Sequence, residues 1–147
     1  MTQFLHGVEV IEIDDGSRPI QTVKSAVIGL VGTAPGAASA IAATLTLGSA
    51  ILNDGMVFTA KKAGTEGNAI SIEVVDPAAA DEALVVTVDG NKVKVTLATD
   101  ASKVITSTAV EIKAAIEADV DATALVGVAV LGDGSGDVAP APRTYLT

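Results

Sequence analysis

The fold is organised around an amino-terminal stretch, Phe4-Leu-His-Gly-Val-Glu-Val-Ile-Glu-Ile-Asp-Asp-Gly-Ser-Arg-Pro-Ile20. Residues 8–13 at its centre are rich in β-branched side chains, which favour strands. Gly7 precedes them and Asp14-Asp15-Gly16 follows them, so turn signals bound the run on both sides. This pattern predicts a short β-strand between two turns.

The predicted strand is apolar on both faces. Val8 and Val10 lie on one face and Ile11 and Ile13 on the other, because side chains alternate along a strand. Either a bulge shifts the register in the middle of the run or both faces become covered. No pairing partner is evident before residue 23, so we expect the strand to join a sheet elsewhere, which can belong to another subunit.

Proline separates this strand from a second apolar run. Pro19 fixes φ and cannot donate to a ladder, and the chain is then nearly continuously apolar from Ala26 to Val31. A short run of this kind suits a strand that is buried on both faces. The alternative to pairing between subunits is therefore an intramolecular hairpin between the first strand and residues 23–31.

Residues 4–37, about a quarter of the chain, resemble the amino terminus of contractile tail sheath proteins, which occur in myophages and in phage-derived particles such as R-type pyocins. The distinctive positions are His6-Gly7-Val8, Asp15-Gly16-Ser17-Arg18 and Ser25-Ala-Val-Ile-Gly-Leu30. The resemblance implies an extended arm that adds a strand to a sheet of a neighbouring subunit. It also implies polymerisation around a tail tube, and contraction that drives the tube through the host envelope.

The resemblance implies a set of partners and a location. The partners are other sheath subunits in a helical homo-oligomer, the tail tube protein, and the baseplate and tail terminator proteins. The location is the tail sheath of a virion, after assembly in the host cytoplasm. The residues expected to contact a neighbouring subunit are Val8, Glu9, Val10, Ile11, Glu12, Ile13, Arg18 and Ile20.

The length of the chain departs from this family. Sheath proteins are much longer than 147 residues, with a large α/β core, a carboxy-terminal arm and a receiving sheet. The chain is therefore expected to be a fragment, a truncated form or a short relative. The alternative function is a non-enzymatic decoration or binding module on a phage tail that contacts the host surface or another tail protein.

Composition and charge exclude several function classes. The formal net charge of −9 argues against nucleic acid as a partner, because nucleic acid requires stripes of lysine and arginine. Aromatic residues make up 2% of the chain, which does not suit a deep ligand pocket. Cysteine is absent, so no disulfide or thiolate metal site is expected. No apolar run approaches the roughly 20 residues of a membrane span, and acidic residues interrupt any signal peptide, so a soluble, non-exported chain is expected.

The motifs that could carry chemistry are isolated. His6 is the single histidine and has no second ligand at a metal-binding spacing. Residues 132–137 (Gly-Asp-Gly-Ser-Gly-Asp) lack the length and closing glutamate of a calcium loop. The adjacent carboxylates Asp14 and Asp15 are expected to accept hydrogen bonds in a turn. We therefore predict no enzyme activity, no catalytic residue, no metal and no cofactor.

Three regions follow from the remaining pattern. Residues 1–36 form the arm with the first buried strand, residues 37–52 form a small-residue linker, and residues 53–147 form a small α+β accessory domain. Within the linker a short strand is expected near Thr44–Leu47. The accessory domain also resembles a module that recurs among phage tail proteins, sheaths included. In a sheath it would be an insertion that projects outward from the tube.

The elements of this domain have clear local signals. Alternating residues predict strands at 56–60 and 69–75, separated by a polar loop at residues 61–68. In the second strand Ser71 and Glu73 are expected on the solvated face. The run from Leu84 to Leu97 predicts a hairpin whose turn is centred on Gly90.

A helix is predicted at residues 106–118, where Thr108 and Glu111 match a capping box. One more helical turn is expected at 122–125, then a strand at 126–131 and an irregular exit over 140–147. The predicted fold class is α+β: an extended arm followed by a small, mostly antiparallel sheet with one packed helix.

Overall fold

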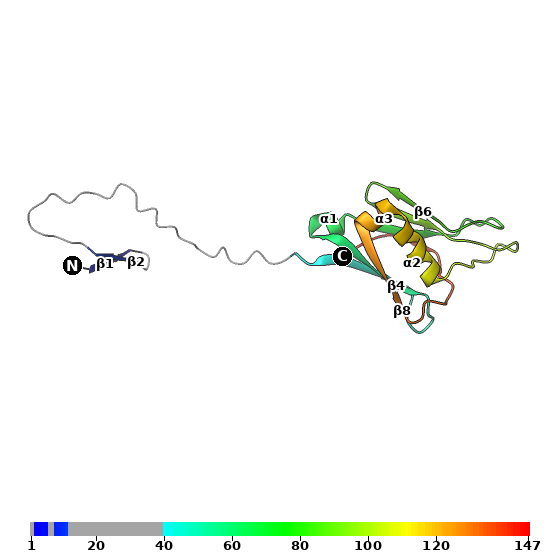
Figure 1. Cartoon of the computed structure of the whole chain (residues 1–147), viewed down its shortest axis with the longest axis horizontal. Helices are drawn as coiled ribbons and strands as arrows, with labels where there is room; N and C mark the ends of the chain where they lie inside the picture. Colours follow the sequence, from blue (N-terminus) through cyan, green and yellow to red (C-terminus); the bar gives the residue numbers. More distant parts are fainter. Residues whose placement is uncertain (1, 6–7, 12–39) are drawn as a thin grey trace, which may run out of the picture. The chain divides into compact units, whose positions relative to one another are not determined.

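A computed structural model describes residues 2–5, 8–11 and 40–147 of the chain. The chain divides into two compact units, Met1–Gly36 and Ala37–Thr147. In the first unit, β1 (Thr2–Leu5) pairs with β2 (Val8–Ile11) in an antiparallel two-stranded sheet (Figure 1). The described part of the second unit, residues 40–147, contains two sheets, three helices and a continuous core.

One sheet of the second unit is three-stranded and fully antiparallel. Its order is β3-β4-β8, with bounds β3 (Ala42–Leu47), β4 (Gly55–Ala63) and β8 (Val126–Leu131). β4 lies at the centre, and its Phe58 stands opposite Leu45 on β3 and Val128 on β8. Phe58 is completely buried, so this row of side chains faces the core.

The other sheet is four-stranded and mixed. Its order is β6-β7-β5-β9, with bounds β5 (Ser71–Val75), β6 (Val85–Asp89), β7 (Lys92–Thr96) and β9 (Ala141–Tyr145). β6 and β7 form the hairpin expected from the sequence, and Gly90 at its turn has φ +57°. β5 runs parallel to β7 and antiparallel to β9.

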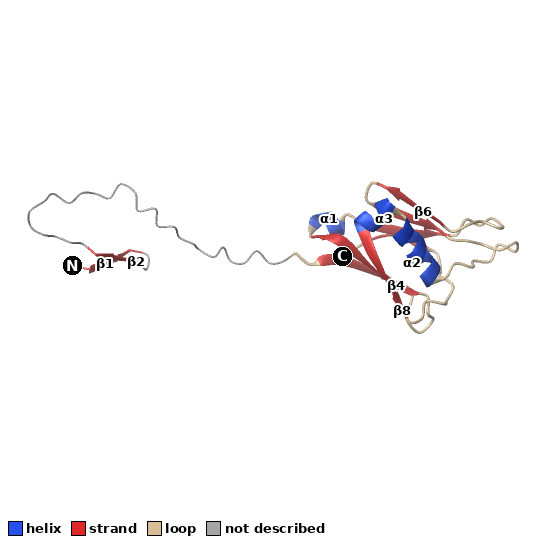
Figure 2. Cartoon of the chain, viewed as in Figure 1, coloured by secondary structure: helices blue, strands red, loops and turns tan. Residues whose placement is uncertain are grey.

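Three helices complete the unit: α1 (Thr65–Asn68), α2 (Ala109–Ala118) and α3 (Val120–Leu125) (Figure 2). Thr108 and Glu111 form the predicted capping box at the start of α2, which satisfies backbone N–H groups that have no partner within the helix. Ile112 and Ile116, one turn apart, are buried, and α2 contacts β8.

The core is built mainly from small aliphatic side chains of both sheets and of α2. Its buried members are Ala43, Met56, Phe58, Ala60, Ile70, Ile72, Val74, Val93, Val95, Leu97, Ala109, Ile112, Ile116, Ala122, Val126, Val128, Val138 and Leu146. Phe58 is the only aromatic residue among them, because Tyr145 is half exposed.

Backbone hydrogen bonds also join the two sheets at one corner. The N–H of Thr44 on β3 donates to the carbonyl oxygen of Thr147 at 2.9 Å, and the N–H of Thr147 donates to the carbonyl oxygen of Thr44 at 3.0 Å. Thr147 lies two residues after Tyr145, where β9 ends. The first and last parts of the unit therefore lie side by side.

The predicted α+β class is confirmed, but the sheet arrangement is a correction. Two sheets replace the single sheet, and one strand pair is parallel. Residues 37–52, expected as a linker, contribute all of β3 to the second unit, because Ala43 is buried and Leu45 and Leu47 pack against the core. The strand expected near Thr44–Leu47 is confirmed and is longer than expected.

Two segments expected to be irregular are regular. The polar loop predicted at residues 61–68 is instead the end of β4 followed by α1. The irregular segment predicted at residues 140–147 contains β9. Because β9 is an edge strand, it tolerates Pro142, which has no backbone N–H to donate. Three helices also replace the single packed helix, since the turn predicted at 122–125 is part of a separate helix, α3.

Candidate subunit interface

The amino-terminal unit presents a two-stranded ribbon. Leu5 stands opposite Val8 and Thr2 opposite Ile11, so all four residues of β2 are paired with β1. In a two-stranded sheet each strand pairs along one edge. Within the described part of this unit, the edge of β2 that faces away from β1 is not paired with another strand. An open strand edge offers unpaired N–H and C=O groups to another chain.

The expected contact residues fall partly on this ribbon. Val8, Glu9, Val10 and Ile11 form β2. The other expected contact residues, Glu12, Ile13, Arg18 and Ile20, lie outside the described residues. The same is true of the apolar run at 23–31, so both the buried strand and the alternative hairpin stay predictions.

The expectation that β2 has no local partner before residue 23 is wrong, because β1 pairs with it. A signal for this pairing exists in the sequence. Phe4 and Leu5 are apolar, and only the dipeptide His6-Gly7 separates the two strands.

A polar surface lies on the face of the four-stranded sheet that is turned away from the core. Ser71 is fully buried there, although it shares the solvated face of β5 with Glu73. Arg143 accounts for this burial, because its Nε donates to Ser71 Oγ at 2.9 Å. Its guanidinium carbon lies 5.2 Å from the centre of the Tyr145 ring, in a cation–π arrangement. Sequence reasoning missed both residues because it placed them in an irregular exit.

Glu73 is the carboxylate at the centre of this face. It forms an ion pair with Lys92, which stands opposite Ser71 on the adjacent strand β7. The hydrogen bond from Lys92 lowers the pKa of Glu73 below its ordinary value of 4.5, and the charges of Lys92, Lys94 and Arg143 lower that pKa further.

We expect Glu73→Gln to lower the free energy of unfolding at pH 7, and this loss to shrink at low pH. A lowered folded pKa means that the ionised carboxylate stabilises the folded state. This contribution is complete above pH 4.5 and disappears as the pH falls through the lowered folded value. Urea denaturation of both proteins at pH 7, 5 and 3 measures the difference.

The matched control is Glu66→Gln. Glu66 pairs with Lys62, but the side chain of Glu66 is 66% exposed, compared with 26% for that of Glu73. A more exposed ion pair contributes less to stability, so the control should show a smaller loss at pH 7. A Glu73→Gln loss that is equal at pH 3 and pH 7 would contradict the prediction.

Two further features concern ligands and membranes. In the loop after β8, the Ser135 hydroxyl and the Ser135 backbone N–H donate hydrogen bonds to Asp133 Oδ1, and the hydroxyl first and the N–H second lower the pKa of Asp133. Within residues 40–147 and the two strands of the ribbon, no three histidine, cysteine or acidic side chains gather as metal ligands would. None of the helices in these same parts has the length and apolar character to cross a bilayer.

Sequence comparison relates the chain to phage tail sheath proteins, as the amino-terminal motif predicts. It is 72% identical over 32 residues to the tail sheath protein of Burkholderia phage BcepMu, a match that covers 22% of this chain and 7% of the relative. It is 37% identical over 89 residues to the tail sheath protein of Escherichia phage P2, a match that covers 60% of this chain and 21% of the relative. No family model matches the chain, and no solved structure matches it significantly.

The similarity to the phage P2 protein reaches beyond the arm. Its 89 residues exceed the length of Met1–Gly36, so more than half of them lie in Ala37–Thr147. The matched part of the chain spans about a fifth of the P2 protein. The relationship therefore includes the Ala37–Thr147 unit.

Proposed function

We propose that the chain is part of a structural subunit of a contractile phage tail sheath. The observation that carries this proposal is the 37% identity to a tail sheath protein over 89 residues, more than half of which lie in the Ala37–Thr147 unit. In this function the amino-terminal ribbon adds β2 to a sheet of a neighbouring subunit, so that identical subunits form a continuous sleeve.

The geometry of the ribbon supports strand exchange. An isolated two-stranded hairpin is at best marginally stable in water, so β1 and β2 gain stability from a third strand or a packed surface. The open edge of β2 can supply main-chain hydrogen bonds to such a strand. The sequence of residues 8–13 is apolar on both faces, which suits a strand covered on both sides.

Helical assembly, enclosure of the tail tube and contraction follow from repeated strand exchange between identical subunits. A contact that joins unlike surfaces of identical subunits generates an open helix rather than a closed ring when its rotation does not close. The sleeve surrounds the tail tube and ends at the baseplate and at the terminator. Contraction is then a change of packing between subunits that drives the tube through the host envelope, with the exchanged strands as tethers. The sleeve assembles in the host cytoplasm and becomes part of the virion.

Incorporation into growing sleeves tests this function. The full chain is added to polymerising tail sheath protein of phage P2, and the sleeves are examined by electron microscopy and by hydrogen exchange. We expect the chain to enter the sleeves, and the amides of residues 8–11 to become protected there, because they pair with a neighbouring subunit.

Val10→Pro is the informative variant, and Val10→Thr is its control. Proline removes a ladder donor and is excluded from central strands, whereas threonine is a good strand former. We expect about tenfold less incorporation for the proline variant, equivalent to about 1.4 kcal/mol, and no loss for the control. A wild-type chain that stays monodisperse, or a proline variant that enters equally well, would overturn the proposal.

A further inference from the structure

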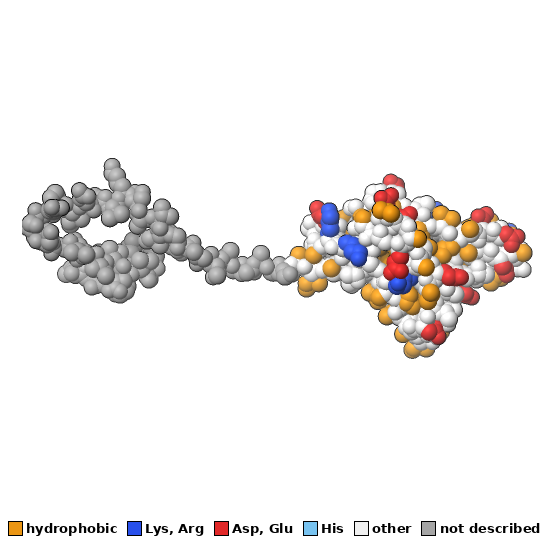
Figure 3. Space-filling view, viewed as in Figure 1, with side chains coloured by type: hydrophobic (Ala, Val, Ile, Leu, Met, Phe, Trp, Pro, Cys, Tyr) orange, Lys and Arg blue, Asp and Glu red, His pale blue; other side chains and the backbone are white. Residues whose placement is uncertain are grey.

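An apolar knob projects from the turn between β3 and β4. It consists of Ile51 and Leu52, whose exposed fractions are 93% and 67%. No other large aliphatic side chain in residues 40–147 is as exposed as Ile51. Hydrophobic and acidic atoms meet at the tip below β8, where the turns that flank β4 and β8 lie (Figures 1 and 3).

Hydrogen bonds hold this turn in one shape. The N–H of Ser49 donates to Asp54 Oδ1 at 2.7 Å, and the N–H of Leu52 donates to Ser49 Oγ at 3.2 Å. The loop after β8 also stabilises the turn, because the N–H of Gly136 donates to the carbonyl oxygen of Asn53 at 2.9 Å. The knob is therefore preorganised, and docking it costs little conformational entropy.

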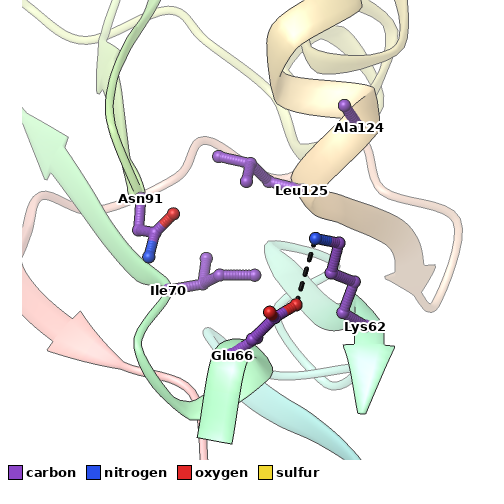
Figure 4. A pocket seen from close by; sticks show the side chains of 6 residues that line it. All are labelled: Lys62, Glu66, Ile70, Asn91, Ala124 and Leu125. Carbon is purple, nitrogen blue, oxygen red and sulfur yellow. Dashed lines mark ion pairs between the residues drawn. The ribbon is translucent and has the colours of Figure 1, made fainter.

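A pocket lies near the opposite end of β4. The knob precedes Gly55, where β4 begins, and the pocket is lined by Lys62, one residue before β4 ends. The complete lining is Lys62, Glu66, Ile70, Asn91, Ala124 and Leu125, whose side chains surround a common space (Figure 4). We call it the end pocket.

The size of the end pocket suits side chains rather than a cofactor. Its volume is about 230 Å³, which is below the roughly 300–1,000 Å³ of small-molecule sites. Ile70, Ala124 and Leu125 give it an apolar wall. The Lys62–Glu66 ion pair at its rim, 3.0 Å long, is well exposed, so a docking group can displace it at little cost.

The charges around the two features are complementary. The two segments at the knob, residues 48–54 and 132–138, carry the carboxylates of Asp54, Asp133 and Asp137 and no lysine or arginine. The end of β4 at the pocket carries Lys61 and Lys62, and Lys62 is paired with Glu66, whose place an acidic group of a docking partner can take. Opposite charges at an interface favour encounter and fix orientation.

We propose that the apolar knob of one copy inserts into the end pocket of a second copy. The contact joins unlike surfaces from opposite ends of β4, so it can repeat from copy to copy in an open row. It involves neither β1 nor β2, and it is therefore independent of strand exchange.

Cross-linking of the full chain tests this contact, because the chain has no cysteine of its own. One protein carries Ala50→Cys beside the knob, and the other carries Ala124→Cys on the pocket wall. Both positions are exposed, so both variants should fold. A short bis-maleimide added to the mixture is expected to link the two proteins, and to link neither protein to itself.

Two substitutions in the Ala50→Cys protein test the role of the knob. Ile51→Asp is expected to lower the cross-linked yield at least about tenfold, because it removes a large aliphatic group from the interface. Val104→Asp, at a 57% exposed position in another loop, is the control and should leave the yield unchanged. Cross-links between like thiols in equal yield, or a yield insensitive to Ile51→Asp, would overturn the proposal.

Val10→Pro in both proteins separates this contact from strand exchange. The yield should not change, because the knob and the end pocket lie in the second unit. A yield that falls with Val10→Pro as far as with Ile51→Asp would assign the association to the arm instead and would also overturn the proposal.

Discussion

Phe58→Ala is expected to lower the free energy of unfolding of the Ala37–Thr147 unit by about 3–5 kcal/mol. Phe58 is completely buried at the centre of the three-stranded sheet. Several of the surrounding core residues are as small as Ala43 and Ala60. Small side chains cannot extend into the space that a phenyl ring leaves, so the cavity persists.

Urea denaturation followed by circular dichroism measures this loss, with Thr59→Ala as the matched control. Thr59 is the next residue on β4, but it is exposed, so its replacement should change stability by no more than about 0.5 kcal/mol. A Phe58→Ala loss no larger than that of the control would mean that the core does not depend on this ring.

Gly136→Ala is expected to lower the free energy of unfolding by about 1–3 kcal/mol. A β-carbon at this position would overlap the carbonyl oxygen of Leu52 and would lie 2.9 Å from the carbonyl carbon of Asn53. These are backbone atoms, so the loop after β8 must move away from the turn before β4. The movement would also break the hydrogen bond from Gly136 to Asn53.

Gly127→Ala is the control for this prediction. A β-carbon there meets only the end of the Lys61 side chain, at 3.5 and 3.7 Å, and that chain can move aside. Thermal and urea unfolding of both variants compare the two glycines. Equal stability of the two alanine variants would show that the close approach of the two loops does not contribute to stability.

Local signals were sufficient where the chain pairs with itself at short range. The β6–β7 hairpin follows from alternating valines around Gly90, and the start of α2 follows from Thr108 and Glu111. These features depend on residues close in the sequence, so the pattern of side chains determines them.

Long-range pairing was not readable from the sequence. β9 has an irregular pattern of exposure and contains Pro142, and it becomes a strand only because β5 offers it a partner. Ser71 appears solvated by its position in the strand, but Arg143, 72 residues away, covers it. Whether β5 runs parallel or antiparallel to β7 also depends on the path of the chain between them.

The candidate interface was predicted in part. A strand was predicted at residues 8–13 from its β-branched residues, and β2 covers Val8–Ile11. Its partner β1 was missed because Thr2–Leu5 is short, and the apolar pair Phe4-Leu5 before His6-Gly7 is the only signal for it. The knob was missed because two consecutive aliphatic residues in a sequence give no sign of exposure. Only the hydrogen bonds of Ser49 and Asp54 direct them outward.

The paired backbones of Thr44 and Thr147 have a consequence for protein engineering. A polypeptide that enters the unit through β3 and leaves after Thr147 departs about one strand spacing, roughly 5 Å, from where it arrived. The unit can therefore be inserted into a surface loop of a recipient protein, because the two ends of that loop do not have to separate to accommodate it. The same geometry makes a direct ligation of the two ends feasible, with new termini opened at Gly90.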